Sequence, residues 1–134
     1  KQCFEDLKDQ YESRGYEVTS GPSEILVGIV PGNINVEFLA PVTLRKEDTQ
    51  TFNKFSVGIA SEWYTLINTA VNIIQYESTF GDSETSLYIS YYPGLTIDKT
   101  RRDDGSTIYQ LRDVTTGDEF AFATRSLVWP QGFA

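Results

Sequence analysis

The sequence predicts an α+β fold: an antiparallel, strongly twisted sheet of about five to six strands, one long helix packed across a face of the sheet, and a short N-terminal helix. Three observations lead to this prediction. Apolar residues recur with a helical period along residues 48–77, and apolar segments flank turn sequences at residues 31–33 and 103–106. The links between successive strands are too short for parallel crossovers, so the strands are expected to pair antiparallel. The predicted order is α-β-β-α-β-β-β-β.

A short helix is predicted over residues 2–14. Phe4, Leu7 and Tyr11 recur at spacings that place them on one side of a helix. Gly15 follows, and glycine readily adopts the left-handed conformation with which many helices end. The helix is therefore expected to pack through one apolar stripe and to keep its acidic residues in solvent.

Two strands are predicted at residues 24–30 and 34–39, joined by a Pro-Gly-Asn turn. The first, EILVGIV, is apolar on both faces, which is typical of a strand in the centre of a sheet. The second alternates, with Ile34, Val36 and Phe38 on its apolar face and polar residues on the other. We therefore expect the first to be a central strand and the second to be half-buried.

The long helix is predicted over residues 48–77. At about 100° per residue, its apolar residues fall on two neighbouring stripes that cover about half of the circumference. This width is expected of a helix that lies across a sheet. The first stripe holds Phe52, Phe55, Ile59, Trp63, Leu66, Ala70 and Ile73, and the second holds Ala60, Tyr64, Ile67, Val71 and Ile74.

Further strands are predicted at residues 86–92, 95–101, 107–114 and 119–129. The first three form a meander, with a Pro-Gly stop after the first and an Asp-Asp-Gly-Ser turn at residues 103–106 after the second. A Thr-Gly-Asp turn leads into the last strand. These short links again indicate antiparallel hairpins.

Composition places the chain among ordinary globular proteins, with 134 residues, 40% of them hydrophobic and 22% charged. No repeat or linker interrupts it, so we expect a single α+β domain over residues 1–134. The formal net charge of −8 disfavours binding to nucleic acid or to an anionic membrane, because both would repel it. No apolar run approaches the roughly 20 residues that a membrane span needs.

The sequence carries no motif for catalysis, for a cofactor or for a metal. It has no histidine and a single cysteine, Cys3, so the usual general base and the usual zinc ligands are missing. The carboxylate pairs Asp103–Asp104 and Asp82–Glu84 lie in predicted turns, where aspartate is favoured for its local hydrogen bonds. We therefore expect a protein that is not an enzyme and binds no cofactor or metal; a histidine-free enzyme that uses carboxylates is one alternative.

The outer side of the predicted long helix is unusual because it carries a single charge, Glu62, between residues 56 and 76. Solvated helix faces ordinarily carry Lys, Glu and Arg. Small uncharged residues let another backbone approach closely, and three occupants fit: the N-terminal helix, a second copy or another protein, or solvent alone. The predicted binding residues on this side are Gly58, Ser61, Glu62, Thr65, Asn68 and Asn72, with Thr69 beside them.

Tyr88 and Tyr92 are candidate ligand-binding residues because they share one face of the strand predicted at residues 86–92. With Tyr109 or Trp129 from neighbouring strands they would form a stacking platform for a carbohydrate or a peptide. Cross-strand aromatic pairing within the sheet is the structural alternative.

These observations favour a non-catalytic protein–protein interaction or self-assembly domain. Its partner would be another protein or a second copy of the chain, bound through the helix face of residues 57–75. The chain starts at Lys1 and contains no methionine, so we expect it to be the soluble part of a larger secreted or membrane-anchored protein, with an extracytoplasmic location. A ligand-binding domain with a tyrosine-rich sheet face is the alternative from another class.

Overall fold

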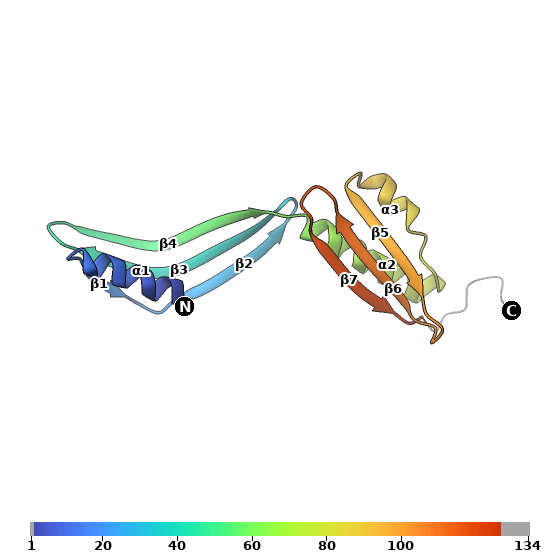
Figure 1. Cartoon of the computed structure of the whole chain (residues 1–134), viewed down its shortest axis with the longest axis horizontal. Helices are drawn as coiled ribbons and strands as arrows, with labels where there is room; N and C mark the ends of the chain where they lie inside the picture. Colours follow the sequence, from blue (N-terminus) through green and yellow to red (C-terminus); the bar gives the residue numbers. More distant parts are fainter. Residues whose placement is uncertain (1, 127–134) are drawn as a thin grey trace. The chain divides into compact units, whose positions relative to one another are not determined.

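The computed structural model describes residues 2–126, and this range contains three helices and seven strands (Figure 1). The fold is of the predicted α+β class, with antiparallel sheets, a short N-terminal helix and a longer helix. The strands form two sheets, of four and three strands, rather than the single sheet expected. The chain divides into two compact units. The first consists of the described residues up to Gly28 together with Asn35–Gly58. The second consists of Ile29–Ile34 together with the described residues from Ile59 onward.

The four-stranded sheet belongs mainly to the first unit, where one helix packs on it (Figure 1). Its elements are α1 (Gln2–Ser13), β1 (Glu17–Ser20), β2 (Glu24–Val30), β3 (Asn33–Arg45) and β4 (Thr49–Ala60). β3 is the shared strand: it pairs with β2, with β4 and, near its C-terminal end, with β1. There Val18 of β1 lies opposite Leu44 in antiparallel register.

α1 follows the sequence pattern. It ends at Ser13, and Gly15 adopts the left-handed φ of +84°. Phe4 and Tyr11 of the predicted stripe pack against the buried core of the first unit, whereas Leu7 stays exposed. This core consists of Ala40, Val42 and Leu44 of β3, with Tyr16, Val18 and Phe38 packed against it.

The predicted hairpin between β2 and β3 is confirmed, with Pro31 and Gly32 as its two-residue turn. Gly32 has a φ of +74°, which a type II turn requires at its second central position, and proline fits the first. A regular antiparallel ladder closed by a two-residue turn places Val30 opposite Asn33.

The prediction of a helix is wrong for residues 49–60, which form β4. The segment is rich in β-branched and aromatic residues, which favour a strand over a helix. It also includes Gly58, and glycine weakens a helix. Phe55 and Ile59 fitted the helical stripe because residues four apart share a face in a strand as well as in a helix. Pairing with β3 decides between the two.

The second unit packs two helices against a three-stranded sheet (Figure 1). Its elements are α2 (Trp63–Phe80), α3 (Ser86–Tyr91), β5 (Leu95–Arg101), β6 (Thr107–Asp113) and β7 (Glu119–Thr124). β6 is the middle strand, and its Tyr109 lies opposite Lys99 of β5 and Phe122 of β7. The core consists of Leu66, Ala70, Ile73, Leu95, Tyr109 and Leu111, with Tyr88, Ile97, Phe120 and Phe122 around it.

α2 begins at Trp63, not near residue 48, and Gly81 ends it with a φ of +84°. Its buried residues include Leu66, Ala70 and Ile73, as expected, but also Thr69 and Glu77. Val71 and Ile74, expected to face the sheet, are exposed. The sheet beneath α2 has only three strands, so the helix buries a narrow stripe rather than half of its circumference.

Residues 86–91 form the short helix α3 and not the predicted strand. The run SLYISYY is too short for its apolar pattern to distinguish a strand from a helix. The Glu84 carboxylate accepts a hydrogen bond from the Ser86 backbone N–H (3.1 Å) at the start of α3. The last predicted strand is confirmed for residues 119–124, and residues 127–129 lie outside the described residues.

Candidate functional site

Strands β2 and β4 expose apolar side chains along their whole length. Every residue of both strands is exposed. Ile25, Val27 and Val57 keep 61%, 62% and 56% of their surface accessible. A strand in a globular protein ordinarily buries alternate side chains against a core. The four-stranded sheet therefore presents apolar surface that the rest of the first unit leaves uncovered.

Contacts across the sheet show which side chains share a face. The rings of Phe38 and Phe55 lie 6.3 Å apart, so Phe55 and, by alternation, Val57 are on the face of β3 that holds its core residues. The ion pair between Glu37 and Lys54 lies on the opposite face. Phe52 contacts Phe55 at 6.1 Å although the two are three residues apart, which indicates a bulge between them.

α1 covers only one end of the apolar face. Its Phe4 ring lies 5.1 Å from Phe38, and on β4 the exposed rings of Phe55 and Phe52 lie beside this covered stretch. The two-residue turn places Ile25 and Val27 of β2 on this same face. We call the part of this face that α1 leaves uncovered the open apolar surface, and it consists of Ile25, Val27, Val36, Phe52, Phe55 and Val57.

The open apolar surface holds no charged residue, although the chain has a net charge of −8. The charged residues of β3 and β4 near it, Glu37 and Lys54, pair with each other on the opposite face. Neither a basic nor an acidic partner would find a complementary charge here. Hydrophobic burial is the interaction that this surface offers.

Sequence reasoning missed the open apolar surface for two reasons. It placed residues 49–60 in a helix, and it placed β2 in the centre of the sheet. The composition of β2 could have revealed this surface, because a strand that is apolar on both faces requires another element to cover each face.

The structure separates the residues of the predicted binding face. Gly58 lies in β4, whereas Ser61 and Glu62 lie at the start of α2. Ser61 is buried, and its Oγ donates a hydrogen bond to Asp118 Oδ2 (2.9 Å). The Glu62 backbone N–H donates to the same oxygen (2.8 Å). Ser61 and the Glu62 backbone therefore anchor α2 to the turn before β7.

Thr65, Asn68 and Asn72 do lie along α2. Thr65 Oγ1 donates to Glu62 Oε2 (2.8 Å), and Asn68 Nδ2 donates to the Tyr64 carbonyl (2.9 Å), so both make local hydrogen bonds. Asn72 is exposed. The exposed apolar residues of the same helix are Tyr64, Val71, Ile74, Tyr76 and Phe80.

The tyrosine platform does not form within residues 2–126. Tyr88 lies in α3 and packs against the core of the second unit, and Tyr92 follows that helix and is exposed. Tyr109 is fully buried. Trp129 lies outside the described residues. Because residues 86–91 are helical, Tyr88 and Tyr92 do not share a sheet face.

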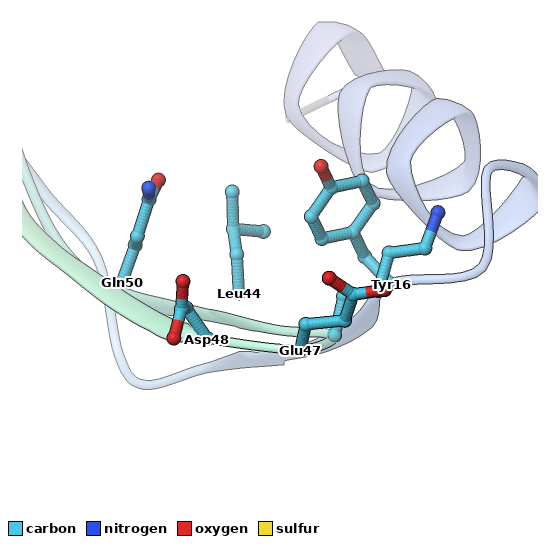
Figure 2. Close-up of a pocket in the computed structure, with 6 residues that line it drawn as sticks. Tyr16, Leu44, Glu47, Asp48 and Gln50 are labelled. Atoms are coloured by element: carbon cyan, nitrogen blue, oxygen red, sulfur yellow. The ribbon is translucent and has the colours of Figure 1, made fainter.

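An open pocket of about 350 Å³ lies beside the turn between β3 and β4 (Figure 2). Lys46 Nζ donates to the Arg14 carbonyl at 2.9 Å and lies 5.1 Å from the Tyr16 ring centroid, so its ammonium group is engaged at the end of α1. The polar residues that line the pocket can hydrogen-bond a small polar molecule. Its lining residues are Tyr16, Leu44, Lys46, Glu47, Asp48 and Gln50.

The second unit buries the carboxylate of Glu77, which accepts a hydrogen bond from the Tyr109 hydroxyl. Burial, together with this bond, raises the pKa of Tyr109 far above its ordinary value, so the phenol remains a donor. Nearby, Lys99 Nζ donates to Asp82 Oδ1 (2.6 Å) and to the Ser83 carbonyl (2.8 Å). These paired groups hold α2 and the following loop on the sheet.

Asp118 stabilises the fold by accepting hydrogen bonds at the start of α2. Burial alone would raise its pKa, but the bonds from the Glu62 N–H, Ser61 and Thr116 outweigh burial and lower the pKa. A carboxyl whose pKa is lower in the folded state stabilises above its unfolded pKa of about 3.9, and this contribution is lost as pH falls through the folded value.

We therefore expect Asp118→Ala to lower the free energy of unfolding by about 1 kcal/mol at pH 7, as the loss of a helix-capping acceptor does. At pH 3 the difference in the free energy of unfolding between the variant and the wild type should shrink, because protonation of the Asp118 carboxylate weakens the same hydrogen bonds in the wild type. Urea denaturation at both pH values measures this. An equal difference at both would contradict a role for the ionised carboxylate.

Comparison with protein-family models, with curated proteins and with solved structures finds no match to this chain. Within residues 2–126, no three or more acidic or cysteine side chains gather as ligands for a metal ion. None of the helices in that range is both long and apolar enough to cross a membrane. The exposed surfaces are therefore the features of this chain that bear on its function.

Proposed function

We propose that this chain is a non-catalytic self-assembly domain whose copies associate through the open apolar surface. The observation that carries this proposal is the exposure of Ile25, Val27 and Val57 in regular strands, on a face without charge. Burying one such aliphatic side chain contributes about 1.5–3 kcal/mol. A micromolar complex needs about 8 kcal/mol beyond the costs of association, so several such side chains must be buried together.

A second copy fits this surface better than a partner of different charge. Interfaces that bind basic proteins carry carboxylates, and those that bind acidic ones carry Lys or Arg. The open apolar surface carries neither, so it complements another neutral, apolar surface. A second copy of the chain presents such a neutral, apolar surface and brings none of its negative charges into the contact.

The test is the mass of the protein in light scattering as its concentration rises. We expect the wild-type mass to increase, and we expect Ile25→Glu/Val27→Glu to associate only at concentrations at least about 100-fold higher. Each added carboxylate would be buried without a partner, and about 1.4 kcal/mol per site already gives a tenfold change.

Thr51→Glu/Ser56→Glu is the matched control. It adds the same two charges to β4 on the polar side, where Thr51 contacts Thr43. This variant should associate like the wild type, and circular dichroism should show that all three proteins are folded. A wild type that stays monomeric at every concentration would contradict the proposed function.

A further inference from the structure

β2 lies at an edge of the four-stranded sheet, although its composition is that of a central strand. It pairs with β3 on one side, and no strand within residues 2–126 pairs with its other side. All of its residues are exposed. Its outer edge therefore presents unpaired backbone N–H and C=O groups between two apolar faces.

Free edges of natural sheets usually carry features that prevent pairing with another chain, such as charges, bulges or short length. β1 is only four residues long, and β5 carries three charged residues. β4 has a bulge after Phe52 and a charge at Lys54. β2 has no charge and no proline from Ile25 to Val30. Its outer edge is open to a further strand.

We propose that β2 pairs antiparallel with β2 of a second copy, about a two-fold axis at Val27. This inference rests on the proposed function and specifies which strand makes the contact. In this register Val27 lies opposite Val27 of the second copy, Ile25 opposite its Ile29, and Leu26 opposite its Gly28. β2 then becomes a central strand, as its composition predicts.

The chemistry of β2 suits this register. Glu24, the charged residue of the strand, lies opposite Val30 of the second copy, so the two Glu24 carboxylates are about 20 Å apart along the strands. A Cβ placed on Gly28 would meet no atom within 4 Å, so space is free there for the facing Leu26. A two-fold axis uses the same edge in both copies, so the assembly closes as a dimer.

The sharpest test uses opposite charges at the axis. Val27→Glu and Val27→Lys should each raise the midpoint of association at least about tenfold, because like charges face each other across the two-fold axis. Mixing the two variants in equal amounts should restore association to within about threefold of the wild type, because Glu then faces Lys. Thr51→Glu is the control: it adds a charge on the polar side of β4, outside the open apolar surface and two strands away from the contact, and should associate like the wild type.

Amide hydrogen exchange provides the second measurement. In an antiparallel ladder, alternate residues direct their N–H to opposite neighbours. Alternate amides of β2, those not bonded to β3, should therefore exchange about tenfold more slowly at concentrations where nine-tenths of the protein is associated.

The outcomes separate this inference from the proposed function. If the wild type associates but the mixture of Val27→Glu and Val27→Lys stays monomeric and the β2 amides do not slow, the copies pack face to face and the β2 pairing is overturned. The proposed function would stand in that case. If the wild type is monomeric at every concentration, both proposals fail.

Discussion

Replacing Leu66 by alanine is expected to lower the free energy of unfolding by about 2–5 kcal/mol. Leu66 is fully buried in the core between α2 and the sheet of the second unit, where it is clustered with Ile73 and Leu111. The substitution removes apolar contacts and leaves a cavity, because the packed neighbours relax only partly. Urea denaturation followed by circular dichroism measures the change.

Val71→Ala is the control for Leu66→Ala. Val71 lies on the same helix but is 43% exposed, so its truncation should cost less than about 1 kcal/mol. If the two substitutions had equal effects, the orientation of α2 on its sheet would be other than the structure shows.

Tyr109→Phe is expected to lower the free energy of unfolding by about 3 kcal/mol. The side chain keeps its shape, but the Glu77 carboxylate, only 3% exposed, loses the hydrogen bond from the tyrosine hydroxyl. A buried carboxylate left without its donor costs more than the net value of the bond, because its desolvation is no longer offset. Thermal and urea denaturation at pH 7 measure this loss.

A double-mutant cycle isolates the interaction. Glu77→Leu removes the carboxylate that Tyr109→Phe leaves unpaired, so the double variant should be more stable than the sum of the single effects predicts, by at least about 1 kcal/mol. Additive effects would show that the two side chains stabilise the protein independently. Leu66→Ala in the same core provides a reference for loss of packing without loss of a polar partner.

Several elements are determined by local sequence. α1 follows from a regular apolar stripe ended by Gly15, and the turn at Pro31-Gly32 follows from residues whose preferred φ values match it. The strands β5, β6 and β7 were predicted to within a few residues because turn sequences separate them. In α2, the sequence identified Leu66, Ala70 and Ile73 as buried residues.

Other elements depend on contacts that local patterns do not encode. Residues 49–60 fit a helical stripe and a strand, and only pairing with β3 selects the strand. Residues 86–91 form a helix whose Tyr88 packs on the core of the second unit. Ser61 and Thr69 are polar in sequence and buried in the structure, since Ser61 bonds to Asp118 and Thr69 faces the sheet.

The candidate site likewise combines one feature set by local sequence with another set by tertiary contacts. The sequence by itself determined that residues 24–30 form a strand apolar on both faces, because side-chain alternation is a property of the strand alone. Only the tertiary structure decided that this strand lies at an edge, since the place of a strand in a sheet depends on pairing between distant segments. An apolar strand with a free edge is the physical reason to expect a second copy there.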